Sequence, residues 1–182
     1  MKIPNSSRKR ALILVDVQPI FILERNKYII SNIKNLINHV SYDLYIEAIF
    51  HAEKGSIWDK QAKVTFPKDE RFHTENELLA LLKNKKTVHV EKFTTSVFKG
   101  SPNVLEALKG SLIEEVHVIG LKTNACVLST AFDAYDQGFF TYVIEECCET
   151  NIPELHKSAI SILQRQNLTN NSCIEEITFQ SI

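Results

Sequence analysis

Six short runs of apolar residues recur along the chain, each about as long as a β-strand and most without alternating polar positions. They cover residues 11–17, 43–50, 87–91, 116–121, 140–144 and 174–179. Near-continuous hydrophobicity over such lengths is typical of strands that are covered on both faces. The pattern therefore predicts a sheet with helices on either side of it.

Between these runs, apolar residues recur at the spacing of amphipathic helices. The clearest stripe consists of Ile29, Ile30, Ile33, Leu36, Ile37 and Val40. Further helices are predicted over residues 75–82, 102–108 and 154–166, with Ser101 as the cap of the helix that begins at Pro102. The alternation of strands and helices predicts a doubly wound α/β sheet, parallel in most of its strands.

Residues 52–72 interrupt the alternation, because they follow neither a strand period nor a helix period. A long irregular segment inside a compact domain often forms a lid or a binding loop. No internal repeat, low-complexity tract or linker divides the chain. We therefore expect a single domain over residues 1–182.

Composition and charge remove several classes of function. The formal net charge is −1 with no basic stripe, which argues against nucleic acid as a partner. No apolar run approaches the length of a membrane helix, and the basic N-terminus is interpreted as leading into a buried strand rather than as a signal peptide. The cysteines form neither a CxxC pair nor a metal-ligand spacing; they are Cys126, Cys147, Cys148 and Cys173. We expect a cytoplasmic protein that acts on a small molecule.

Three chemically different side chains lie directly after three of the predicted strands. Asp16 lies at the end of the first run, Lys92 follows residues 87–91, and Cys126 lies in the first turn of the helix after residues 116–121, with Thr123 or Asn124 as its cap. In an open parallel sheet, ligands bind beyond the carboxyl ends of the strands. We therefore expect a carboxylate, an ammonium and a thiol at one edge, where a helix N-terminus favours the thiolate.

These segments resemble the isochorismatase-like cysteine hydrolases, a family that includes nicotinamidases and other small-amide hydrolases. The resemblance rests on "ALILVDVQPIF", "KFTTSVFKGSPNVLEAL" and "VIGLKTNACVLSTAFDAYDQGF" in this order. It implies a three-layer, six-stranded sheet of Rossmann-type topology and a catalytic triad of Asp16, Lys92 and Cys126. It also implies an oxyanion hole formed by the backbone N–H groups of Lys122 and Cys126, a cis peptide bond between Leu121 and Lys122, and a homo-oligomer, either a dimer or a tetramer.

The leading hypothesis is an amidohydrolase that cleaves a C–N bond of a small, planar or carboxylated molecule through a thioester on Cys126. The alternatives are an isochorismatase-type enol-ether hydrolase, which in the family needs the aspartate but not the thiol, and a non-catalytic binding protein on the same fold. A thiol-redox protein that pairs Cys126 with Cys147 or Cys148 is a further alternative. Weaker candidates for lining a substrate pocket are Gln18, Phe21, Trp58 and Phe98.

The nicotinamidases of this family bind a metal through an Asp-x-His pair after the second strand and through a later histidine. Here His51 matches the first histidine and His73 is a candidate for the second, but Ile49 stands at the aspartate position. Because isoleucine cannot ligate a metal, we expect neither a metal nor another cofactor. The remaining alternative is a makeshift site in which Glu47 or Glu53 shares one strand face with His51.

Overall fold

The computed structural model describes residues 8–169 and Phe179, and the structural statements below refer to these residues. Five parallel strands form one sheet in the order β3-β2-β1-β4-β5. The strands are β1 (Arg10–Val15), β2 (Leu44–Phe50), β3 (Thr87–Lys92), β4 (Glu115–Leu121) and β5 (Phe140–Glu149). The chain builds outward from β1 to β3 and then returns to β4 on the other side of β1. The switch point of the topology therefore lies between β1 and β4.

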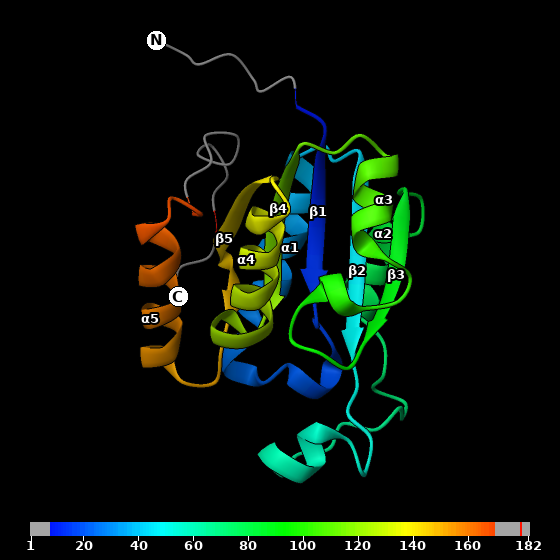
Figure 1. Ribbon diagram of the computed structural model, residues 1–182, viewed down its shortest axis with the longest axis vertical. Helices are drawn as coiled ribbons and strands as arrows, with labels where there is room; N and C mark the ends of the chain where they lie inside the picture. Colours follow the sequence, from blue (N-terminus) through cyan, green and yellow to red (C-terminus); the bar gives the residue numbers. More distant parts are fainter. Residues whose placement is uncertain (1–7, 170–178, 180–182) are drawn as a thin grey trace.

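Five α-helices cover the sheet and create three layers (Figure 1). Helices α1 and α2 lie on one face, α3 and α4 lie on the other, and α5 lies beside β5. Their bounds are α1 (Tyr28–His39), α2 (Asn76–Leu82), α3 (Val104–Gly110), α4 (Leu128–Asp136) and α5 (Pro153–Arg165). The predicted doubly wound α/β class is confirmed. The structure describes five strands, and the predicted sixth, residues 174–179, lies outside the described residues except for Phe179, which packs against the core.

The central strands are buried on both faces, which explains why their sequences lack alternation. In β1, every residue from Ala11 to Val15 is at most 1% exposed. All seven residues of β4 are buried as well. The apolar stripe of α1 packs against the same core through residues such as Ile33 and Leu36. Among the described residues, no helix combines the length and the apolarity that crossing a bilayer requires.

The start of α3 differs from the prediction. Asn103 caps this helix, and its side-chain oxygen accepts hydrogen bonds from two amides of the first turn. Pro102 follows a cis peptide bond and lies before the helix. The predicted cap, Ser101, is wrong because its backbone is extended and forms an antiparallel bridge with Glu91 of β3.

The irregular residues 52–72 project beyond the carboxyl ends of β1 and β2 (Figure 1). An antiparallel bridge between Ala52 and Phe66 closes the base of this segment, and a single π-helical turn, η3 (Trp58–Ala62), lies near its tip. The indole N–H of Trp58 donates to the carbonyl of Phe93 over 2.8 Å. The segment is thus anchored next to the strand ends, where ligands bind in this class of sheet.

Candidate active site

Asp16 and Lys92 form an ion pair across the end of β2. Asp16 follows β1 directly, and Lys92 is the last residue of β3. Lys92 Nζ donates to Asp16 Oδ2 over 2.7 Å and to the carbonyl oxygen of Thr94 over 3.1 Å. The side chains of Lys92 and Asp16 are only 0% and 3% exposed. Because desolvation makes a buried ion pair a poor source of stability, this pair indicates a functional site at the sheet edge.

Cys126 joins the pair from the other side of β1. It lies in the π-helical turn η5 (Thr123–Val127), which directly follows β4 and Lys122. The Lys122 carbonyl accepts hydrogen bonds from two amides of this turn, at 3.0 and 3.2 Å. The thiol lies close enough to Asp16 and Lys92 for both charges to act on it. The structure thus brings together the three residues that the sequence singled out. It also contains the expected cis peptide bond between Leu121 and Lys122.

The protonation state of the thiol differs from the sequence expectation. Burial raises the pKa of Cys126, the neighbouring Asp16 carboxylate raises it further, and Lys92 opposes both. Burial and Asp16 therefore favour the protonated thiol, the opposite of the thiolate that the helix N-terminus predicted. No side chain caps the turn, so neither of the predicted caps, Thr123 and Asn124, acts as one. The Thr123 hydroxyl instead hydrogen-bonds His156 over 2.9 Å.

Asp16 has the properties of a base that is held ready for this thiol. Burial raises its pKa, while the charge and hydrogen bond of Lys92 oppose that effect. Its second oxygen, Oδ1, is buried and has no hydrogen-bond partner among the described residues. The backbone at Asp16 has φ of 53°, a conformation that non-glycine residues rarely adopt. This bend turns the chain off β1 at the switch point of the sheet.

Close contact between β1 and β4 at the switch point requires a glycine. Gly120 has φ of 117°, and a Cβ atom on it would lie 2.1 Å from the carbonyl oxygen of Val15. Any side chain at this position would therefore push apart the strands that carry Asp16 and Cys126. The glycine of the motif thus has a packing role as well as a conformational one.

Four aromatic side chains form a wall beside the ion pair, and we refer to Phe21, Phe50, Phe66 and Trp58 as the aromatic wall. The ring centroids of Phe21 and Phe66 are 5.0 Å apart, and those of Phe50 and Trp58 are 5.1 Å apart. Phe21 and Phe50 lie 6.5 Å apart and connect the two pairs. Lys92 Nζ lies 4.9 Å from the centroid of Phe50. Phe21 and Trp58 were pocket candidates from the sequence, whereas Phe50 and Phe66 were not.

The other two pocket candidates do not belong to this wall. Gln18 is buried, and its amide donates to the Phe50 carbonyl over 3.2 Å and accepts from the Phe50 amide over 2.7 Å. Gln18 thus holds an aromatic residue of the wall in place. Phe98 belongs to the short helix η4 (Val97–Lys99) and packs against the core.

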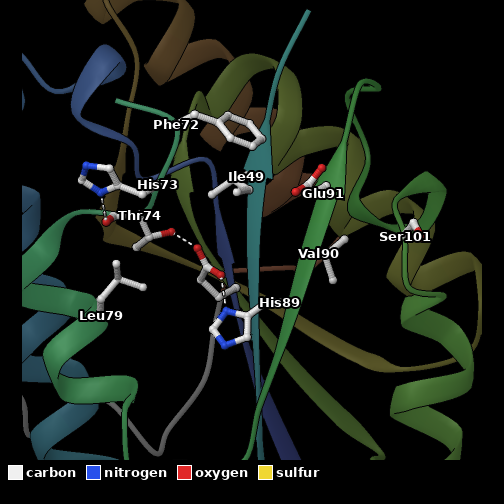
Figure 2. Close-up of a pocket in the computed structure, with 10 residues that line it drawn as sticks. Ile49, Phe72, His73, Thr74, Leu79, His89, Val90, Glu91 and Ser101 are labelled. Carbon is white, nitrogen blue, oxygen red and sulfur yellow. Dashed lines mark hydrogen bonds and ion pairs between the residues drawn. The ribbon is translucent and has the colours of Figure 1, made fainter. Parts of the chain in front are cut away.

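The residues at the metal position of nicotinamidases do not fit a metal. Figure 2 shows Ile49 beside Phe72 at a cavity of about 470 Å³, with the His73 ring turned away from Ile49. His73 Nδ1 lies 2.7 Å from the Thr74 carbonyl oxygen. The ring of His51 packs edge-to-face on Phe72, with centroids 5.4 Å apart. Apolar contacts thus occupy the position where the resemblance would place a carboxylate ligand.

The makeshift alternative is also unsupported. Glu47 is buried and accepts hydrogen bonds from the Thr74 hydroxyl and from His89 Nδ1, the latter over 2.7 Å (Figure 2). Glu53 Oε1 lies 3.9 Å from His51 Nδ1, a pairing that supplies only two ligands. Within the described ranges, no three His, Cys, Asp or Glu side chains gather closely enough to hold a metal ion.

The remaining described cysteines lie inside β5. Cys147 and Cys148 are both 0% exposed, and burial raises the pKa of each thiol. Cys126, Cys147 and Cys148 are free thiols, and Cys173 lies outside the described residues. Deep burial gives this vicinal pair a packing role and no support for a redox function.

One protein and several solved structures are similar to this chain. The isochorismatase family protein PncA of Bacillus subtilis (strain 168), described as uncharacterized, is 37% identical over 73 residues. These residues make up 40% of this chain and 39% of that protein, so the match spans about two fifths of its length. The crystal structure of nicotinamidase PncA from Bacillus subtilis is 26% identical, covers 90% of this chain and 98% of its own, and superimposes with a TM-score of 0.71.

A second solved structure supports the fold alone. The pyrazinamidase of Pyrococcus horikoshii, crystallised in complex with zinc, is 18% identical, covers 88% of this chain and 97% of its own, and has a TM-score of 0.73. In addition, the family model of the isochorismatase domain matches residues 10–174, which include all the strands and helices described above. This chain therefore belongs to the isochorismatase family.

Proposed function

We propose that this protein is a cysteine hydrolase that cleaves the C–N bond of a small amide. One observation carries the proposal: Asp16, Lys92 and Cys126 arrive from three separate strands and meet as a buried carboxylate, ammonium and thiol. A thiol beside a carboxylate base is the arrangement that nucleophilic catalysis requires. The overall similarity to the Bacillus subtilis nicotinamidase supports amide chemistry.

In the proposed mechanism, proton transfer accompanies attack because burial and Asp16 raise the pKa of the thiol. Asp16 Oδ1 takes the thiol proton while Cys126 Sγ bonds to the amide carbon, and the backbone N–H groups of Lys122 and Cys126 stabilise the oxyanion. Asp16 then gives the proton to the leaving nitrogen as the C–N bond breaks, which leaves a thioester. Water attacks the thioester with Asp16 as the base, and the acid and the thiol are released. Lys92 holds Asp16 in place and offsets its charge.

An enol-ether hydrolase of the isochorismatase type is the second candidate, because the raised pKa of Asp16 also suits a general acid. That reaction makes no use of Cys126, although the thiol lies beside the same carboxylate. The amide reaction therefore explains more of the site. A dimeric or tetrameric assembly, which the resemblance implies, and the cytoplasmic location expected from the composition stay predictions.

The test is a screen of small amides, ureides and N-carbamoyl compounds for ammonia release. The Cys126→Ala and Asp16→Asn variants are each expected to lower kcat at least ~10³-fold, the scale for removal of a nucleophile or its base. Mass spectrometry of the protein quenched during turnover should find an acyl adduct on the Cys126 peptide. Hydrolysis that survives Cys126→Ala but not Asp16→Asn would favour the enol-ether reaction instead.

A further inference from the structure

Lys122 places a second ammonium group beside the candidate nucleophile. This residue lies between β4 and the η5 turn, and its side chain is partly buried. Lys122 Nζ lies 6.0 Å from the ring centroid of Phe21, and Lys92 Nζ lies 4.9 Å from that of Phe50. These two rings are neighbours in the aromatic wall. The two ammonium groups thus lie over adjacent rings of the aromatic wall.

The two lysines differ in how their charges are compensated. Lys92 has Asp16, whereas Lys122 forms no ion pair with any residue that the structure describes. Glu149 attracts it only at longer range, since this carboxylate lies beyond ion-pair distance and accepts a hydrogen bond from the Tyr28 hydroxyl over 2.8 Å. Arg25 adds a second positive charge on the same side. A partly desolvated cation without an anion is costly, and an anionic ligand would offset that cost.

We propose that Lys122 is a specificity-determining residue that binds a carboxylate of the substrate, and that the substrate is a planar amide carrying such a group. Monoamides of aromatic or unsaturated dicarboxylic acids have this chemistry. The inference rests on the proposed hydrolase function. The thiol attacks the amide carbon, the aromatic wall contacts the flat face, and Lys122 pairs with the carboxylate, with Arg25 at the exposed rim. A neutral amide leaves the charge of Lys122 unpaired.

Two matched pairs of amides test this inference in the wild-type protein. Benzamide is compared with 3-carbamoylbenzoate, and crotonamide with fumaramate, so that the members of a pair differ chiefly in one carboxylate. We expect kcat/KM to favour the carboxylated member of each pair at least ~10-fold, the scale of one charge-assisted hydrogen bond. Added salt should reduce this preference, because it screens a partly exposed charge pair.

Variants then assign the preference to Lys122. Lys122→Met is expected to lower the ratio of the two kcat/KM values ~10- to 100-fold, mainly through KM, and Lys122→Arg should restore most of it. Lys109→Met is the matched control, because Lys109 is exposed on α3 and lies outside the candidate site. An unchanged ratio in Lys122→Met would overturn the inference, as would a wild-type protein that prefers the neutral amides.

A binding measurement separates this inference from the proposed function. Calorimetric titration of the Cys126→Ala variant with 3-carbamoylbenzoate and with benzamide needs no turnover. Tighter binding of the carboxylated ligand, weakened at least ~10-fold when Lys122→Met is added, would support the anion site. If no amide is hydrolysed in the same study, that result would refute only the hydrolase function. Hydrolysis of amides without this difference in binding would overturn the anion site alone. Failure of both ligands to bind, with no hydrolysis, would count against both proposals.

Discussion

Replacement of Lys92 by methionine isolates the charge of Asp16 inside the protein. The substitution keeps the length and the apolar stem of the side chain but removes the ammonium that lies 2.7 Å from Asp16 Oδ2. Neither side chain is accessible enough for water to replace the lost partner. Breaking a buried ion pair by removing one member typically costs about 3–5 kcal/mol. We expect Lys92→Met to lower the free energy of unfolding by this amount when Asp16 is ionised.

Protonation of Asp16 limits the loss and makes it depend on pH. Burial already raises the pKa of Asp16, and removal of Lys92 raises it further because Lys92 opposes that shift. In the unfolded chain the same carboxyl titrates near pH ~3.9. Above that pH, native Asp16 retains a proton that the unfolded chain has released. The variant therefore loses about 1.4 kcal/mol of stability per pH unit until the native carboxyl ionises.

Urea unfolding of the wild type, Lys92→Met and the double variant Asp16→Asn/Lys92→Met, at about pH 4, 6 and 8, measures this dependence. The free energy of unfolding of the single variant should be closest to that of the wild type at the lowest pH and should fall furthest below it at the highest pH. The double variant carries no charge at this position, so at the highest pH it should regain at least ~2 kcal/mol relative to the single variant. A loss that is equal at all three pH values, or no gain in the double variant, would refute the reasoning.

Two further predictions concern the thiol and the metal position. Because burial and Asp16 raise the pKa of Cys126, the rate of its alkylation by iodoacetamide should still increase above about pH 8.5. At neutral pH, alkylation should be faster in Asp16→Asn than in the wild type. A wild-type rate that reaches its plateau near neutral pH would contradict this prediction. Peptide mapping should find Cys126 labelled before the fully buried Cys147 and Cys148. Because Ile49 cannot ligate a metal, dialysis against a chelator should leave ammonia release unchanged. Stoichiometric zinc in elemental analysis, with activity restored by zinc alone, would overturn that prediction.

The sequence by itself was sufficient to locate the five strands that the structure describes and the positions of the three reactive groups. Strands such as β1 and β4 lie inside the sheet, so their burial on both faces appears directly as apolar runs. Asp16, Lys92 and Cys126 were predictable as a group because parallel strands all end at the same edge of the sheet. The replacement of the family's carboxylate ligand by Ile49 was also visible without coordinates.

Local patterns failed where contacts across the chain compete with them. Ser101 has the composition of a helix cap, but its pairing with Glu91 keeps it extended, and Asn103 caps α3 instead. Phe50 and Phe66 gave no sign of a shared wall, because their contact depends on how residues 52–72 fold back onto the strand ends. Neither the cap nor the wall follows from the residues next to it in the sequence.

The charges in the site were decided only by the tertiary structure. A helix N-terminus is a local feature and predicted a thiolate at Cys126. The opposite result follows from burial and from Asp16, which belongs to a different strand and is distant in sequence. The resemblance assigned only the backbone N–H of Lys122 to the site, and the uncompensated charge of its side chain emerged only with the positions of Phe21 and Arg25. Desolvation and Coulomb interactions depend on distances through space, so a linear pattern predicts which groups are present but not which of them are charged.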